Sequence, residues 1–108
     1  MYYIYMLRCK DNSIYTGITT DIKRRMKEHF SKNEKCAKYT FNHDALKLEK
    51  LWQTENRSLA SKLEFNIKRL NKNQKEKLIL DNNSFEKLLS KYIECHKYIC
   101  ISNIEVNV

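Results

Sequence analysis

Proline is absent from this sequence of 108 residues, and glycine occurs only once. Disordered chains, collagen-like chains and flexible linkers are rich in these residues, so their scarcity excludes those classes and argues against an internal linker. The length is also too small for two ordinary domains. We therefore expect any function to lie on one compact scaffold.

Long apolar runs are missing as well, and the amino terminus lacks the basic start and small-residue cleavage site of a secretory signal. The four cysteines form no Cys-x-x-Cys pair, which argues against a closed zinc site even though His96 follows Cys95. Thiols in a charged chain without a signal are typical of a reducing compartment. We expect a cytoplasmic protein with no membrane partner, and the sequence indicates no oligomeric state.

Acidic residues are few relative to basic ones, with 13 Asp and Glu against 21 Lys and Arg and a formal net charge of +8. Such an excess on a small domain produces a positive field, and phosphate is the commonest partner of such a field. Charge on a lysine-rich surface also serves solubility, so charge alone leaves both interpretations open. It favours a nucleic-acid partner.

Two segments rich in β-forming residues, 2–9 and 13–19, predict a β-hairpin. A two-residue turn would place Tyr5 and Tyr15 on opposite faces, whereas a three-residue turn over 10–12 places them together. Only the three-residue turn gives a tyrosine face that remains available beside an aliphatic core face. The tyrosine face would carry Tyr3, Tyr5, Tyr15 and Gly17, and the core face Ile4, Met6, Ile14 and Ile18.

Residues 21–32 predict a helix that is capped by an aspartate at its start. Its buried stripe would consist of Ile22, Met26 and Phe30. Arg25 and His29 lie at the edge of that stripe and, being four residues apart, stack on the same side. From there both side chains can reach a cleft beside the core.

The middle of the chain predicts a loop over residues 33–43, a third strand over 45–52, and a second helix that opens at Asn56 or Ser58. The apolar stripe of this helix would be Leu59, Ala60, Leu63, Ile67 and Leu70. Glu64 lies at its border.

The remaining segments predict a short helix over 71–80 and an amphipathic helix over 84–93 that is capped by Ser84. The tail from Tyr98 alternates like a strand and would add to a sheet edge or mediate self-association. Nothing in the tail points to chemistry.

Four blocks follow one another in a suggestive order: Tyr3-Ile4-Tyr5, Tyr15-Thr16-Gly17, the DIKRRMKEH segment at 21–29 and the LEFNIK segment at 63–68. Together they resemble the GIY-YIG nuclease superfamily, and most closely its small single-domain bacterial branch, which is related to the nuclease module of the excision-repair endonuclease. The resemblance implies an α/β (α+β) fold, with a three-stranded antiparallel sheet flanked by helices. It covers residues 1–80 as a nuclease domain and leaves 81–108 as a helical extension and tail.

The resemblance also implies, position by position, a catalytic set in which one carboxylate holds a divalent metal. The set is Tyr5, Tyr15, Arg25, His29 and the metal-binding Glu64, and Gly17 ends the second motif. As a hard oxygen ligand, Glu64 suits Mg²⁺ or Mn²⁺. Tyr15 is the first choice for the general base, although its ordinary pKa of about 10 requires help from a nearby cation. Arg25 would hold the phosphate, and His29 would donate or accept a proton near neutral pH.

Each assignment competes with an ordinary structural role, because strand tyrosines usually pack and Glu64 forms an i,i+4 pair with Lys68. The whole constellation outweighs these alternatives. A phosphate-binding surface is predicted beside it, with Gly17 allowing close approach. Its basic members are Lys23, Arg24, Lys27 and Lys68, with Lys62 and Arg69 close by.

Three positions depart from the pattern of the family. Tyr3 replaces the glycine of the first motif, Ile18 stands where the repair enzymes have lysine, and residues 76–79 lack the asparagine that family members often place there. The chain also lacks a helix-turn-helix, zinc finger or RING-like cysteine array, so homing or restriction is disfavoured.

These residues predict a metal-dependent DNA endonuclease that hydrolyses phosphodiesters, is structure-selective or weakly sequence-specific, and acts in DNA repair or recombination. One alternative is a nucleic-acid-binding module that keeps the fold but has lost catalysis. Another is a protein-interaction domain that uses the carboxy-terminal helix and strand. The sequence does not indicate whether the DNA is single-stranded, duplex or branched.

Overall fold

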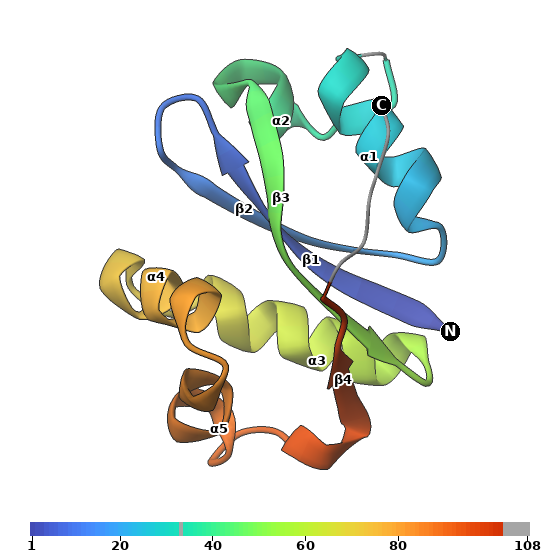
Figure 1. Cartoon of the computed structure of the whole chain (residues 1–108). Helices are drawn as coiled ribbons and strands as arrows, with labels where there is room; N and C mark the ends of the chain where they lie inside the picture. Colours follow the sequence, from blue (N-terminus) through green and yellow to red (C-terminus); the bar gives the residue numbers. More distant parts are fainter. Residues whose placement is uncertain (33, 103–108) are drawn as a thin grey trace.

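One antiparallel sheet forms the centre of the computed structural model, which describes residues 1–32 and 34–102. Its strands are β1 (Tyr2–Cys9), β2 (Ile14–Thr19), β3 (Ala45–Thr54) and β4 (Tyr98–Cys100), in the spatial order β2-β1-β3-β4. The predicted α/β fold with an antiparallel sheet flanked by helices is confirmed (Figure 1). The strand expected in the tail adds a fourth member to the sheet, beside β3.

The hairpin between β1 and β2 has the three-residue turn. Residues 10–12 form it, and a 2.9 Å backbone hydrogen bond joins the two residues that flank it. Asn12 has a φ of 71°, the left-handed conformation with which such turns commonly end. The register pairs Tyr5 with Gly17, so Tyr15, two residues before the glycine, lies on the same face as Tyr5.

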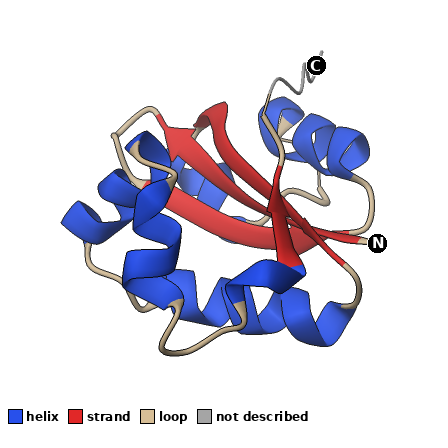
Figure 2. Cartoon of the chain, turned by 60° about the horizontal axis from the view of Figure 1, so that its bottom comes forward, coloured by secondary structure: helices blue, strands red, loops and turns tan. Residues whose placement is uncertain are grey.

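Helices cover both faces of the sheet (Figures 1 and 2). On the tyrosine face lie α1 (Ile22–Ser31) and α2 (Lys38–His43), and on the opposite face lie α3 (Arg57–Lys68), α4 (Lys72–Leu80) and α5 (Asn83–Leu89). A 3₁₀ helix (Cys95–Lys97) leads into β4. The molecule is therefore a three-layer sandwich of helices, sheet and helices.

Side-chain caps fix where three of these helices begin. Asp21 accepts a hydrogen bond from the amide of the third residue of α1, as predicted. Asn56 rather than Ser58 caps α3 in the same way. Asn71 and Gln74 form a reciprocal capping box at the start of α4. The residues at these positions thus determine where the chain turns back onto the sheet.

Each face of the sheet has its own core. The tyrosine face packs against α1 through Tyr5, Leu7, Ile22, Met26 and Leu51. The other face packs against α3, α4 and α5 through Ile4, Met6, Ile14, Trp52, Ala60, Leu63, Ile67, Leu78, Leu89, Ile93 and Tyr98. The hairpin alone predicts that the tyrosine face is available as an open surface. The structure differs, because α1 and α2 cover this face and leave Tyr5 only 1% exposed.

Two predicted elements differ from the structure. The loop predicted for residues 33–43 contains α2. The helix predicted for 84–93 is α5, which ends at Leu89 and holds Ser84 inside its first turn instead of at its cap. One further turn, closed by the Ile93 amide on the Leu89 carbonyl at 3.0 Å, carries Ile93 into the core, so the apolar spacing continues beyond the helix end.

The tail was predicted to be a strand throughout, and the part of it over residues 103–108 lies outside the described residues. In the part of the chain that the structure describes, no helix has the length and apolar character to cross a membrane.

Candidate active site

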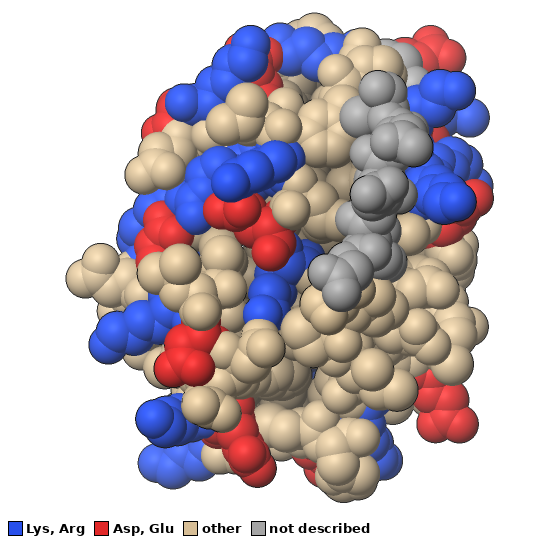
Figure 3. Space-filling model, viewed as in Figure 1, with Lys and Arg blue, Asp and Glu red and all other residues tan. Residues whose placement is uncertain are grey.

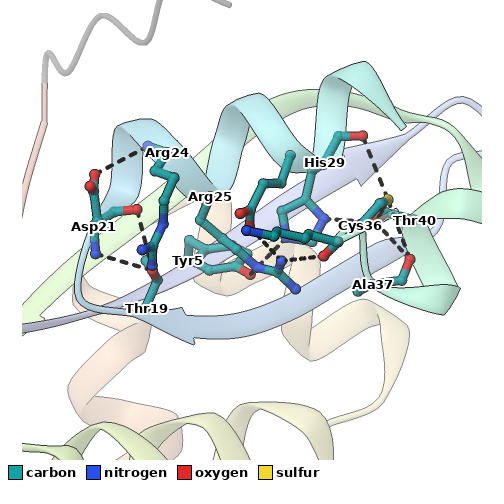
Figure 4. A network of polar contacts seen from close by, with 11 residues as sticks. Tyr5, Thr19, Asp21, Arg24, Arg25, His29, Cys36, Ala37 and Thr40 are labelled. Carbon is teal, nitrogen blue, oxygen red and sulfur yellow. Dashed lines mark hydrogen bonds and ion pairs between the residues drawn. The ribbon is translucent and has the colours of Figure 1, made fainter. Parts of the chain in front are cut away.

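Tyr5 lies in the middle of β1, and its hydroxyl is the centre of a buried polar network (Figure 4). The hydroxyl oxygen is 2.8 Å from Nε2 of His29 and 3.4 Å from Nε of Arg25. Burial, and next the neighbouring Tyr15, raise the pKa of Tyr5 far above its usual range. Tyr5 is therefore a protonated hydroxyl at neutral pH, and not a phenolate.

His29 is completely buried, with 0% of its surface exposed. The sequence pattern places it at the edge of the α1 stripe, and this placement is wrong because α2 covers that side of the helix. Its second ring nitrogen, Nδ1, lies 2.7 Å from the Thr40 hydroxyl of α2. Burial, and next the positive charge of Arg25, lower the pKa of His29 to about 4. The imidazole is therefore neutral at physiological pH.

Gly17 faces Tyr5 across the β1–β2 pair. A β-carbon at this position would lie 2.6 Å from Cζ of Tyr5, closer still to its hydroxyl oxygen, and 3.1 Å from the Tyr15 ring. The sequence predicts that Gly17 allows a close approach to its backbone. In the structure the group that approaches Gly17 closely is the Tyr5 side chain. Glycine at this position provides the space that the Tyr5 hydroxyl occupies.

Arg25 borders the network on its solvent side. Its Nη1 donates to the Glu28 carboxylate at 2.8 Å and to the Lys35 carbonyl at 2.7 Å, while Nε points to Tyr5. The side chain keeps 21% of its surface exposed. Arg25 lowers the pKa of the Glu28 carboxyl, so both charges persist at neutral pH. The guanidinium is thereby fixed next to Tyr5 while still in contact with solvent.

Tyr15 is half-buried at the start of β2 and belongs to a row of rings. Its ring centroid lies 6.2 Å from that of Tyr5 and 5.4 Å from that of His29. On another side it stacks on Tyr39 of α2 at 5.6 Å, and Tyr39 stacks in turn on His43 at 4.2 Å. Tyr5 and Tyr15 of the hairpin and His29 of α1 therefore meet at one place.

Glu64 approaches this place from the opposite layer of helices. It pairs with Lys68 at 3.2 Å, one turn further along α3, and the Lys68 ammonium lies 5.8 Å from the centre of the Tyr15 ring. The Glu64 charge also contributes to raising the pKa of Tyr5. β2 is an edge strand, so α3 can reach around it to the tyrosine face.

As a metal ligand, Glu64 would not belong to a larger cluster of ligating side chains. Within residues 1–32 and 34–102, no three His, Cys, Asp or Glu residues are grouped to hold a metal ion. The Glu64 side chain keeps 24% of its surface exposed. A partly exposed single carboxylate fits Mg²⁺ or Mn²⁺, which bind through one or two carboxylates and complete their coordination with waters and phosphate oxygens.

The predicted phosphate-binding residues occupy two helices, near the surface of the molecule. Lys23, Arg24 and Lys27 lie on α1, and Lys68 lies on α3 beside Tyr15. Figure 3 shows basic side chains spread over the whole of one face, with acidic ones among them. On that face the positive charge is therefore not gathered into a single patch.

Glu76 stands among the residues where family members often have an asparagine, and it has a different partner. Its two carboxylate oxygens accept from Nη1 and Nη2 of Arg8 at 2.6 and 2.5 Å. Arg8 also donates to Glu49 at 3.0 Å. This position therefore joins α4 to the hairpin and to β3, and does not extend the candidate site.

Two residues next to the site, Tyr39 and Thr40, were missed in the sequence. Both lie on α2, inside the segment predicted as a loop. The spacing of Tyr39 and His43, four residues apart, was a signal that these rings could stack on a helix. No local pattern marked Thr40, because its partner His29 is eleven residues away in the chain.

The family described as the GIY-YIG catalytic domain matches residues 1–77 of the chain. The protein therefore belongs to this family of nuclease-type domains, which generally bind nucleic acid and whose nucleases generally depend on a divalent metal. This confirms the resemblance that the four sequence blocks indicated.

More particularly, the chain is similar to UPF0213 proteins. One from Fusobacterium nucleatum is 46% identical over 86 residues, which are 80% of this chain and 84% of that protein. One from Citrobacter koseri is 46% identical over 89 residues, which are 82% of this chain and 87% of that protein. The solution NMR structure of a UPF0213 protein from Bacillus halodurans is 36% identical and covers 82% of this chain and 98% of that chain, with a TM-score of 0.49.

Proposed function

We propose that the protein is a metal-dependent DNA endonuclease that hydrolyses phosphodiester bonds. The observation that supports this most strongly is the convergence of Tyr5, Tyr15, Arg25 and His29, from three elements, at the strand edge that Glu64 approaches from α3. Unrelated packing or surface roles would not bring these five side chains to one place. Structure selectivity or weak sequence specificity, and a role in repair or recombination, belong to the same proposal.

The two tyrosines have different roles in this proposal. Tyr5 is buried and protonated, and it cannot take a proton from water without first giving up its own. Tyr15 is half-buried, with a cation over its ring, and is the better placed of the two to meet a substrate. We assign Tyr15 as the general base and Tyr5, held by His29, as the group that orients it.

Arg25 and Lys68 supply positive charge to the phosphate. Arg25 is permanently charged and is held rigidly by Glu28, so it can stabilise negative charge that develops during cleavage without reorganising. Lys68 stands on the other side of Tyr15. Lys23, Arg24 and Lys27 lie outside this centre and would hold the flanking backbone of the DNA.

Glu64 would hold the divalent cation that the family generally needs. When bound, a Mg²⁺ or Mn²⁺ ion would supply positive charge at the scissile phosphate. Lys68 would leave the Glu64 carboxylate and turn to the phosphate, since its side chain is half exposed and can change rotamer. One carboxylate implies weak metal binding in the absence of DNA.

A cleavage assay tests the proposal. Single-stranded, duplex and branched DNA are incubated with the protein in Mg²⁺, Mn²⁺ or chelator, beside Tyr15→Phe and Glu64→Gln. We expect metal-dependent cleavage that each substitution reduces by about a hundredfold or more, while DNA binding survives. Tyr92→Phe and Glu86→Gln, which change the same groups outside the site, serve as matched controls. Cleavage that persists in both site variants would contradict the assigned site.

One observation favours the alternative of a binding module without catalysis: the only carboxylate assigned to the metal is already paired, with Lys68. In that case DNA binding would be salt-sensitive and no metal would produce cleavage. The same assay distinguishes the two functions. Under either one, we propose that residues 1–80 form the nucleic-acid-acting domain and that 81–108 are an extension of it.

A further inference from the structure

The His29 imidazole is held between two hydroxyl groups, one on each side. Nε2 faces Tyr5 at 2.8 Å and Nδ1 faces Thr40 at 2.7 Å (Figure 4). All three side chains are almost completely buried, with at most 1% of each exposed. Water therefore has little access to these bonds, and each hydrogen needs a protein acceptor.

We propose that Thr40 is a positioning residue of the active site, which fixes His29 in the tautomer that carries its proton on Nδ1 and so leaves Nε2 free to accept the Tyr5 hydroxyl. The role of the tautomer in catalysis rests on the proposed nuclease function. The assignment of the tautomer itself does not.

The Tyr5 hydroxyl determines the direction of the first bond. Its two side-chain partners in the described part of the chain are Arg25 and His29. Arginine has only donors, so the Tyr5 hydrogen can go only to Nε2 of His29. Nε2 must therefore lack a hydrogen, and a neutral imidazole then carries its hydrogen on Nδ1.

The Thr40 hydroxyl completes the chain. Its oxygen lies 3.1 Å from the carbonyl of Ala37, which can only accept, so the Thr40 hydrogen points there. The Thr40 lone pairs then face Nδ1–H of His29 and the thiol of Cys36, whose sulfur is 3.0 Å away. Every hydrogen from Tyr5 to Ala37 has an acceptor in this arrangement.

The opposite arrangement leaves one group unpaired. If Thr40 donated to Nδ1, the hydrogen of His29 would be on Nε2 and would point at the Tyr5 oxygen. Tyr5 would then face donors from both His29 and Arg25, and its own buried hydrogen would lack an acceptor. Leaving a buried donor unsatisfied costs enough free energy to decide between the two tautomers.

α2 brings Thr40 to this position. Thr40 is the buried residue of that short helix, and its hydroxyl binds back to the carbonyl three residues earlier. Threonine in this conformation offers an oxygen that is rigid at χ1 and already committed as a donor on one side. The residue is fully buried and thus acts only through His29.

The experiment compares Thr40→Val, which removes the hydroxyl but keeps the shape, with Thr40→Ser, which keeps the hydroxyl. Thr16→Val is the matched control, because the buried Thr16 hydroxyl has no hydrogen-bond partner among the described residues. Two-bond ¹H–¹⁵N spectra of the full chain at pH 7 report which imidazole nitrogen carries hydrogen, and loss of signals in His29→Gln assigns them. Cleavage kinetics are measured on the same proteins.

We expect the Nδ1–H form in the wild type, Thr40→Ser and Thr16→Val. We expect a mixture of both tautomers in Thr40→Val, where either tautomer leaves one buried hydrogen, on Nδ1 or on Tyr5, without an acceptor. We expect kcat to fall about tenfold or more in Thr40→Val with little change in KM, and to recover in Thr40→Ser. An Nε2–H tautomer in the wild type, or an unchanged Nδ1–H tautomer in Thr40→Val, would overturn the inference. If the wild type cleaves no DNA, the proposed function fails, whereas the spectra still decide the role of Thr40.

Discussion

Tyr5 and Gly17 face each other on neighbouring strands, and the Tyr5 ring leaves no room for a side chain at position 17. The Tyr5 hydroxyl is anchored to His29, so its ring cannot move away from the Gly17 backbone without breaking a buried hydrogen bond. Gly17 here serves close approach and not an unusual backbone angle, since no glycine in the described chain has a positive φ. The buried hydrogen bond to His29 therefore also determines that only glycine fits opposite the Tyr5 ring.

Gly17→Ala is expected to destabilise the fold by about 1–3 kcal/mol, because the added methyl overpacks a buried ring. Urea unfolding measures this loss. In a Tyr5→Leu background, which removes the ring atoms that the methyl would meet, the same substitution should cost much less. A cost that is equal in both backgrounds would show that the ring contact is not its cause.

His29 makes stability depend on pH in a defined window. Its pKa is about 6.5 in the unfolded chain and about 4 in the folded protein, where burial and then Arg25 oppose protonation while Glu28 favours it. The unfolded state therefore binds the proton first, and stability falls as the pH drops from about 6.5 to about 4, by at most about 1.4 kcal/mol per pH unit. His29→Gln should flatten this part of the urea-unfolding profile. An unchanged slope in the variant would assign it to other groups.

At the residue scale, sequence reasoning succeeded where one element decides the outcome. The caps at Asp21 and Asn56 depend on a side chain and its own helix, and both were predictable. The burial of His29 was not, because a helical wheel describes one helix and α2 was not expected to cover it. The carboxylate of Glu64 was correctly placed at the border of a stripe, yet its proximity to Tyr15 depends on how α3 packs at the β2 edge.

At the scale of elements, α2 contacts both His29 and Tyr15 of the candidate site. Its buried residue contacts His29, and its neighbour Tyr39 stacks on Tyr15 with an angle of 29° between the rings. The helix has six residues, and its sequence KYTFNH is rich in residues of modest helix propensity. Tertiary contacts therefore maintain it, which explains why a local pattern predicted a loop.

Tyr39→Leu is expected to lower stability by about 1 kcal/mol and to reduce kcat, since the substitution removes the ring that packs on Tyr15. Phe41→Leu is the matched control, because it removes a ring from the same helix at a position that is 53% exposed. Tyr39→Phe should behave as the wild type. Urea unfolding and cleavage rates measure the effects, and equal losses in the Tyr39 and Phe41 variants would mean that only helix formation is affected.

The three β-strands were predictable from alternation, and the sequence narrowed the hairpin register to two alternatives set by the turn length, of which the structure has the three-residue turn. Once the turn has three residues, the register is fixed, and Tyr5 must pair with Gly17. The end of α5 was not predictable from spacing, because a single turn after the helix continues the apolar pattern to Ile93. Periodicity reports which residues are buried and does not distinguish a helix from the turn that follows it.

At the scale of the whole molecule, the sheet separates two helical layers, and both of them carry basic residues. α1 presents Lys23 and Lys27 from one layer, and α3 presents Lys68 from the other. We expect a DNA backbone that passes Tyr15 beside Lys68 and extends over α1 to contact both layers. The net charge of +8 then acts mainly through the lysines nearest the bound backbone, since screening at physiological salt limits charge effects to about 8 Å.

Salt dependence of binding distinguishes lysines that contact phosphate from lysines that only add charge. Removing one lysine–phosphate pair should reduce the slope of log K against log salt by about 1, so Lys23→Ala and Lys68→Ala should each show that change. Lys87→Ala on α5 removes the same charge from an exposed position away from the site and should leave the slope unaltered. DNA binding measured by fluorescence anisotropy from about 50 to 200 mM salt gives these slopes. Equal slopes in all three variants would mean that the protein attracts DNA by its overall charge, and the two-layer contact would then be wrong.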